Sequence, residues 1–206
     1  MEKDILRTGF IDLDKTININ EPKVIFLGGR PGVGKTAFAI NILANIGLKQ
    51  NIPVLMLNLE ESKEKIINRI ISKETQFDIS KIKSNELNDL EKIKVQDTRK
   101  LIENSKIFIE DTNISSLNKI IELIRKYVKE YEVRFIALDY LQLIDFKLSS
   151  DRKIENILWK LREISYELKI TIFITSQISR TLIERKNKRP DIKDLINKEA
   201  ILKYAD

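Results

Sequence analysis

The feature that most constrains this chain is a cluster of glycines near its N-terminal end. The 206 residues include only six glycines, and four of them fall in the stretch from Gly28 to Gly34. The segment Gly29-Arg-Pro-Gly-Val-Gly-Lys-Thr36 fits the pattern G-x-x-x-x-G-K-[ST] and lies between an expected strand and an expected helix. A chance match in a chain of this length has a probability on the order of 1%, given glycine at about 7% of residues. The segment therefore predicts a phosphate-binding loop (P-loop) within an α/β fold.

Each residue type in this loop suits the binding of a nucleotide. Glycines allow backbone N–H groups to turn toward phosphate oxygens, and the next helix, expected from Lys35 to about Leu48, points its positive end at the same anion. Lys35 adds a charge for the β and γ phosphates, and the Thr36 hydroxyl can ligate magnesium, so ATP and Mg2+ are the expected cofactors. The expected nucleotide contacts are Gly29, Arg30, Pro31, Gly32, Val33, Gly34, Lys35, Thr36 and Ala37.

Apolar segments of strand length alternate along the chain with longer segments of helical period. This alternation is typical of an α/β fold, a mainly parallel open sheet with helices on both faces. Five strands are expected, at residues 24–27, 54–58, 106–109, 135–139 and 171–176. Apolar spacings of three and four indicate helices at 117–128, after an N-cap at Ser115 or Ser116, and at 154–168. The polar stretch 76–103 is expected to form two short helices.

Composition limits the remaining classes of function. With 42% apolar residues the chain can bury one sizeable core, so a single domain at residues 1–206 is expected. No apolar run approaches the roughly 18 residues that cross a bilayer, and the charged N-terminus resembles no secretory signal, so a cytoplasmic protein without membrane contact is expected. The absence of cysteine and histidine excludes disulfides, zinc sites, thiolate chemistry and histidine catalysis. Any catalysis must use carboxylates, lysine, arginine or a metal ion held by oxygens.

Three polar residues follow apolar strands and are candidates for a site beside the P-loop. Asp139 ends the fourth expected strand, the usual place for a magnesium-binding carboxylate, although apolar strands often end in Asp. Glu60 follows the second strand, where a carboxylate can activate water, yet Glu60 and Glu61 would equally favour the first turn of the next helix. Gln177 follows the last strand and is either a sensor of the γ-phosphate or an ordinary polar strand end. The residues alone leave these alternatives open.

Much of the net charge of +6 gathers in one short stretch near the C-terminal end. Five basic residues stand there against the single acid Glu184. They are Arg180, Arg185, Lys186, Lys188 and Arg189. Such a cluster is compatible with a polyanionic partner, although basic surfaces also serve solubility.

Five segments, in order, resemble the RecA-like motor domain of DnaB-type replicative DNA helicases. They are Thr8-Gly-Phe-Ile-Asp-Leu-Asp14, Gly29-Arg-Pro-Gly-Val-Gly-Lys-Thr-Ala-Phe-Ala39, Leu57-Asn-Leu-Glu60, Leu138-Asp-Tyr-Leu-Gln-Leu143 and Thr175-Ser-Gln-Ile-Ser-Arg180. The resemblance runs nearly end to end. It implies a RecA-like P-loop NTPase fold and an ATP hydrolase that acts on single-stranded DNA.

The resemblance also implies roles for individual residues. Glu60 would be the general base, Asp139 would act with Thr36 at magnesium, and Gln177 would couple the nucleotide to DNA-facing loops, so the expected catalytic residues are Glu60, Lys35 and Gln177. The strand 171–176 would insert between the P-loop strand and the Asp139 strand. Two loops, 146–152 and 180–189 continuing toward Lys198, would neutralise DNA phosphates. The expected DNA-binding residues are Arg152, Arg180, Arg185, Lys186, Lys188, Arg189 and Lys198.

Departures from the family pattern leave other readings open. A family segment rich in Arg, Glu and Gly is replaced by Asp194-Leu-Ile-Asn-Lys-Glu-Ala200, and the chain stops at Asp206, before the family's closing strands and arginine finger. The N-terminal collar domain is missing too, so we expect a fragment of a longer helicase or a reduced relative. The family implies a ring-type homo-oligomer in the full-length context and replication or loader proteins as partners.

Two other functions remain open at this point. One is a nucleotide-dependent adaptor or loader that binds a helicase or recombinase partner without unwinding DNA itself. The other is a RecA-like recombination or clock-type ATPase, which shares the fold but not the string Asp139-Tyr-Leu-Gln-Leu143.

Overall fold

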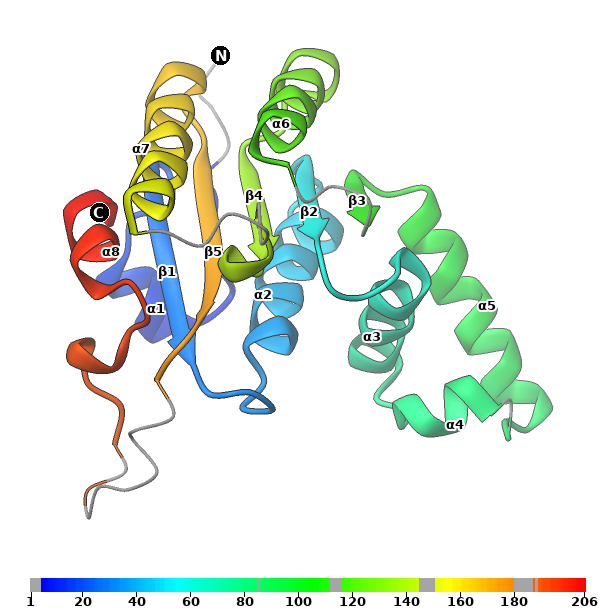
Figure 1. Ribbon diagram of the computed structural model, residues 1–206. Coiled ribbons are helices and arrows are strands. Elements are labelled where there is room, and N and C mark those ends of the chain that lie inside the picture. The colour runs from blue at the N-terminus through cyan, green and yellow to red at the C-terminus, as the bar shows by residue number, and fades with distance from the viewer. Residues whose placement is uncertain (1–4, 85, 112–115, 145–150, 180–186, 188) are drawn as a thin grey trace.

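A five-stranded parallel sheet forms the centre of the molecule (Figure 1). The computed structural model describes residues 5–84, 86–111, 116–144, 151–179, 187 and 189–206. The strands are β1 (Lys23–Gly29), β2 (Val54–Asn58), β3 (Ile107–Asp111), β4 (Phe135–Asp139) and β5 (Thr171–Gln177). All five expected strands are confirmed. The order β1-β5-β4-β2-β3 also confirms that β5 lies between β1 and β4.

Helices cover both faces of the sheet, as the alternating pattern predicts (Figure 1). They are α1 (Ile11–Thr16), α2 (Lys35–Ala44), α3 (Lys63–Thr75), α4 (Ile79–Ser84), α5 (Asp89–Glu103), α6 (Leu117–Tyr131), α7 (Asp151–Leu168) and α8 (Lys198–Tyr204). The segment Asn45–Lys49 continues α2 as a π-helical turn, and Leu141–Leu143 and Ile192–Asp194 are short 3-10 turns. Within the described residues, none of the helices combines the length and the apolar character that crossing a membrane would need.

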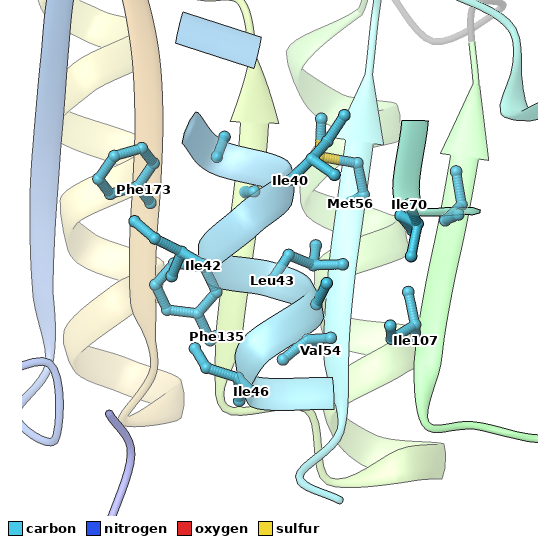
Figure 2. Packing of buried hydrophobic residues seen from close by; sticks show 14 of the residues in the cluster. Ile40, Ile42, Leu43, Ile46, Val54, Met56, Ile70, Ile107, Phe135 and Phe173 are labelled. Atoms are coloured by element: carbon cyan, nitrogen blue, oxygen red, sulfur yellow. The ribbon is translucent and has the colours of Figure 1, made fainter. Parts of the chain in front are cut away.

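The helix after the P-loop, α2, is buried against one face of the sheet (Figure 2). Ile40, Ile42 and Leu43 are at most 1% exposed, since α2 is apolar around most of its circumference. They pack with strand side chains such as Met56 and Phe135. The core on this side therefore fixes the start of α2, and with it the P-loop, against the strands.

Alternate strand residues face the opposite core, which α6, α7 and α8 cover. Leu55 and Leu57 point to this side, whereas Val54 and Met56 point toward α2. The spacing that predicted a helix at 117–128 is confirmed by α6, and Ser116 is its N-cap residue.

Three expectations about local structure need correction. Helix α5 has 15 residues and is not short; a capping box between Asn88 and Glu91 and the ion pair of Arg99 with Glu64 stabilise this largely polar helix. The helix after the P-loop changes to a π-helical turn at Asn45. Residues 151 and 152, expected in a loop, belong to α7. The first turn of this helix is polar, so the apolar spacing that predicted the helix begins only after it.

The carboxyl ends of β1, β2, β4 and β5 meet at one edge of the sheet, the lower edge in Figure 1. Ligands of open parallel sheets bind at this edge. The residues that the sequence marks as candidates for nucleotide chemistry lie at the ends of these strands, in the loops that follow them or in the first turn of α2.

Candidate active site

The P-loop joins β1 to α2 and is shaped by two glycines. Gly32 has φ of 76° and Gly34 has φ of 96°, both in the left-handed region that favours glycine. The side chain of Lys35 folds back over the loop, and its Nζ donates to the carbonyl oxygens of Gly29 and Arg30, at 3.0 Å each. The loop therefore holds the ammonium group inside its own turn.

The electrostatic environment of Lys35 suits a polyanion. Burial lowers the pKa of Lys35 below its ordinary value of 10.5, while the carboxylates of Asp139 and Glu60 act in the opposite direction. Phosphate groups beside the ammonium would favour its charged form and so raise that pKa again. Phosphate groups that bind beside Lys35 would thus stabilise its ammonium group.

Asp139 links the P-loop to β4 and β5. It is 2% exposed. Its Oδ2 accepts a hydrogen bond of 2.6 Å from the Thr36 hydroxyl, and its Oδ1 accepts one from the Thr175 hydroxyl. A carboxylate beside a threonine hydroxyl provides the hard oxygen ligands that magnesium prefers.

Glu60 is held at the end of β2 by the side chain of Asn58. The fully buried Asn58 accepts hydrogen bonds at its Oδ1 from the backbone N–H groups of Glu60 at 3.0 Å and Glu61 at 3.1 Å. Helix α3 starts only at Lys63, so the acid of its first turn is Glu64. Glu60 and Glu61 therefore precede the helix, and support of its first turn does not explain them.

The second carboxylate, Glu61, pairs with Arg69 of α3. The Arg69 Nε donates to Glu61 Oε2 and its Nη2 donates to Oε1, both at 2.8 Å. This pairing lowers the pKa of Glu61 and raises the pKa of Arg69. The carboxylates of Asp139 and Glu60 raise the pKa of Arg69 further. Helix α3 thus adds a cation to the surroundings of the P-loop.

Gln177 and Tyr140 complete the edge. Gln177 ends β5 and lies opposite Gly29 in the β1–β5 register. Burial raises the pKa of the Tyr140 hydroxyl, the carboxylates of Glu60 and Asp139 add to the effect, and a hydrogen bond with Gln177 acts against it. Tyr140 therefore lies among the candidate base, the candidate metal ligand and the candidate sensor.

One cavity brings these side chains together. It is lined by Pro31, Gly32, Gly34, Lys35, Thr36, Ala37, Glu60, Glu61, Arg69, Asp139, Tyr140 and Gln177. Three expected nucleotide contacts are not part of this lining: Gly29 and Arg30 offer their carbonyls to Lys35, and Val33 is 63% exposed. The charged lining consists of three carboxylates and two cations.

The expected DNA-binding residues are less fully described. Arg180, Arg185, Lys186 and Lys188 lie outside the described residues. Arg152 lies within α7 and not in a loop, and its side chain is not among those described. Arg189 is exposed, with its N–H donating to Asn187 Oδ1 at 3.0 Å, and Lys198 is the first residue of α8.

Several residues of this site are not among those that the sequence predicts. Asn58 carries a recognisable signal, since asparagine after a strand often caps a turn through its side chain. Thr175 and Tyr140 stand inside segments that resemble a known family, but nothing in their spacing indicates a contact with Asp139 or Gln177. No sequence pattern marks Arg69 as part of the site, because its pairing with Glu61 depends on the direction in which α3 leaves the sheet.

Comparisons with known proteins agree with this geometry. The family model described as "DnaB-like helicase C terminal domain" matches residues 6–206. A probable replicative DNA helicase of Trieres chinensis is 33% identical over 98% of this chain and 46% of its own length. A probable plasmid replicative DNA helicase of Chlamydia muridarum is 35% identical over 98% of this chain and 46% of its own. The chain spans about half the length of these curated relatives.

Two solved structures share the fold. One is an ATPase domain, which matches with a TM-score of 0.88 and 28% identity, over 100% of this chain and 75% of that one. The other is a DnaB-like replicative helicase, whose structure was described together with its interactions with primase. It matches with a TM-score of 0.89 and 28% identity, over 100% of this chain and 51% of that one. These matches confirm the expected RecA-like fold. By its sequence match and its structure, the chain belongs to the family of DnaB-like helicase C-terminal domains.

Proposed function

We propose that this chain is the ATP-binding and ATP-hydrolysing motor domain of a DnaB-type replicative helicase that acts on single-stranded DNA. One observation carries the proposal: Lys35, Thr36, Glu60, Asp139 and Gln177 reach a single cavity from the ends of four neighbouring strands. Phosphoryl transfer depends mainly on positioning and on stabilisation of charge, and this set of groups supplies both. The names of the curated relatives, replicative DNA helicases, support the same function.

Each residue has a distinct proposed role. Lys35 and the P-loop backbone bind the phosphates. Glu60, whose backbone is fixed by Asn58, orients the attacking water and accepts its proton. Gln177 hydrogen-bonds the terminal phosphate, so that binding or loss of this phosphate changes the position of the segment that follows β5.

The residues also fit a magnesium ion. Thr36 and Asp139 offer hydroxyl and carboxylate oxygens, and the described residues contain no group of three or more His, Cys, Asp or Glu side chains placed to hold a metal ion by themselves. Magnesium commonly keeps several waters and takes phosphate oxygens beside one or two carboxylates, which matches so small a donor set. When bound, the ion would neutralise charge that develops on the phosphate oxygens.

The basic segment after β5, residues 180–189 and continuing toward Lys198, is the proposed contact with DNA. The described residues that flank it are joined directly after Gln177: Ile178 forms an antiparallel bridge with Leu195, and the N–H of Ser179 donates to the carbonyl of Asp194 at 2.7 Å. The described residues before and after the basic cluster therefore meet beside Gln177. Lysine and arginine there would bind DNA phosphates without reading bases, and salt would weaken the contact.

Assembly and location follow from the same proposal. We propose that residues 1–206 form one motor domain, that it works within a ring of identical subunits in a longer protein, and that replication proteins such as primase or a loader are its partners in the cytoplasm. A single subunit should hydrolyse ATP slowly, because an arginine finger supplied by another protein or subunit contributes about 10³ to 10⁵ in rate.

The test is ATP hydrolysis by the chain with and without single-stranded DNA, at low and high salt, beside Lys35→Ala and Glu60→Gln. We expect slow hydrolysis that DNA stimulates at low salt and that both substitutions abolish. Hydrolysis that survives Lys35→Ala would overturn the proposal. ATP-dependent binding of a helicase partner, with no response to DNA, would identify an adaptor or loader.

A further inference from the structure

Strand β5 continues past the point where its neighbour β4 stops. The β4–β5 register ends at the pair Leu138 and Ile174, whereas the β1–β5 register continues to the pair Gly29 and Gln177. The last three residues of β5 are therefore paired in the sheet on the β1 side only. A strand end with one open side is free to shift unless other groups hold it.

Side-chain hydrogen bonds take the place of the β4 backbone pairing along this open side. The Thr175 hydroxyl donates to Asp139 Oδ1. Beyond it, Gln142 Nε2 donates to the Ser176 hydroxyl at 2.8 Å, and Gln142 Oε1 accepts from the Gln177 N–H at 3.3 Å. The carboxamide of Gln142 thus binds two successive residues of β5 through its two different ends.

The position of Gln142 is itself well determined. It lies in the 3-10 turn Leu141–Leu143, two residues after Tyr140 leaves β4, and its neighbour Leu141 is fully buried. Ser176 is also fully buried. Gln142 does not line the nucleotide cavity, whereas Gln177 does. Gln142 is linked to this cavity through its hydrogen bonds to Ser176 and Gln177.

We propose that Gln142 is a positioning residue that fixes Gln177 in the nucleotide cavity by clamping the open side of β5. The proposal rests on the proposed function of the cavity. It adds that the strand carrying the sensor is held by Asp139 at Thr175 and by Gln142 at the next two residues. The turn after Asp139 thereby connects the candidate magnesium ligand with Gln177 at the end of β5.

Loss of the two Gln142 hydrogen bonds should lower the rate of ATP hydrolysis and leave the affinity for ATP nearly unchanged. Gln142→Leu removes both hydrogen bonds while roughly keeping the size of the side chain. We expect kcat to fall about tenfold to a hundredfold, because misplacement of a catalytic group by about 1 Å can cost 10²-fold. The KM for ATP should change less than about threefold, since the P-loop contacts stay in place.

A conservative variant separates positioning from mere packing. In Gln142→Glu the carboxylate still accepts from the Gln177 N–H and also accepts from the Ser176 hydroxyl, so the clamp is retained. We expect at least about a third of the wild-type kcat. Gln96→Leu, at an exposed glutamine of α5, is the matched control and should leave hydrolysis unchanged.

The decisive experiment is a double-mutant cycle of Gln142→Leu with Gln177→Ala in steady-state ATP hydrolysis, with thermal unfolding of every variant. If Gln142 acts through Gln177, the double variant should be no slower than Gln177→Ala alone. Losses that multiply, or a Gln142→Leu enzyme as fast as the wild type, would overturn the inference while leaving the proposed function intact. Wild-type hydrolysis that ignores Lys35→Ala would instead overturn the proposed function.

Discussion

The ion pair between Glu61 and Arg69 should stabilise the fold by about 1 kcal/mol. A hydrogen bond to a charged group contributes about 1.5–3 kcal/mol when it is buried, whereas exposed ion pairs contribute about 0.2–1 kcal/mol. The Arg69 side chain is 35% exposed and that of Glu61 21%, and two bonds of 2.8 Å join them. After discounting for solvent screening, the expected loss in Glu61→Gln is about 1 kcal/mol, near the top of the exposed range.

This contribution should depend on pH in a defined direction. Arg69 lowers the pKa of Glu61 below its ordinary value of 4.5 in the folded chain. A carboxyl group with a lowered folded pKa stabilises the fold fully above its unfolded pKa, and this stabilisation is lost as the pH falls through the folded value. The difference between wild type and Glu61→Gln should therefore be constant at neutral and mildly acidic pH and shrink below about pH 4.5.

The assay is urea denaturation of both proteins at pH 7, 5.5, 4.5 and 3.5. The matched control is Glu64→Gln, whose partner is Arg99 and whose side chain is 60% exposed, so its cost should be smaller. For a chain of this size, 1 kcal/mol corresponds to a change in Tm of about 2–4 °C. A difference below about 0.2 kcal/mol at pH 7, less than the range measured for exposed pairs, would show that this ion pair does not stabilise the fold. So would a difference that persists unchanged at pH 3.5.

Three further outcomes follow from the same structure. Glu60→Gln should lower kcat by about 10²- to 10⁴-fold with little change in ATP affinity by calorimetry, because Glu60 acts as base and not as a phosphate ligand; a matching loss of affinity would contradict this. Chelation of magnesium with EDTA should weaken ATP binding at least about tenfold. Three carboxylates and two cations give the cavity a net charge of −1, which repels phosphates that carry no magnesium. Equal ATP affinity with and without EDTA would contradict this prediction. Leu43→Ala, at 0% exposure, should cost about 2–5 kcal/mol in urea denaturation, whereas Leu90→Ala, at 79% exposure, should cost almost nothing.

Most of the sheet and the four site residues Lys35, Thr36, Glu60 and Asp139 were predictable from the sequence. Strands buried on both faces are continuous apolar runs, so β2 and β4 were placed with their correct bounds. The P-loop pattern placed Lys35 and Thr36, and a parallel sheet brings the ends of its strands to one edge, which placed Glu60 and Asp139 beside them. The position of β5 between β1 and β4 followed only from the family resemblance.

The rest depends on contacts that no local pattern records. The pairing of Glu61 with Arg69 depends on the direction in which α3 leaves β2. The hydrogen bonds of Gln142 to β5 depend on β5 extending beyond the end of its pairing with β4. Helix α5 was expected to be short because its stability comes from capping and ion pairs and not from a buried apolar face. Such interactions join residues whose spacing is set by tertiary structure.

The most direct test of the central claim is calorimetric titration of the chain with ATP and magnesium, for the wild type, for Lys35→Ala and for Lys129→Ala, an exposed lysine of α6. We expect the wild type and Lys129→Ala to bind one ATP with equal affinity and Lys35→Ala to bind at least about a hundredfold more weakly, since a charge-assisted contact of about 3 kcal/mol is removed. Equal binding by Lys35→Ala would contradict the claim that this cavity is the nucleotide site.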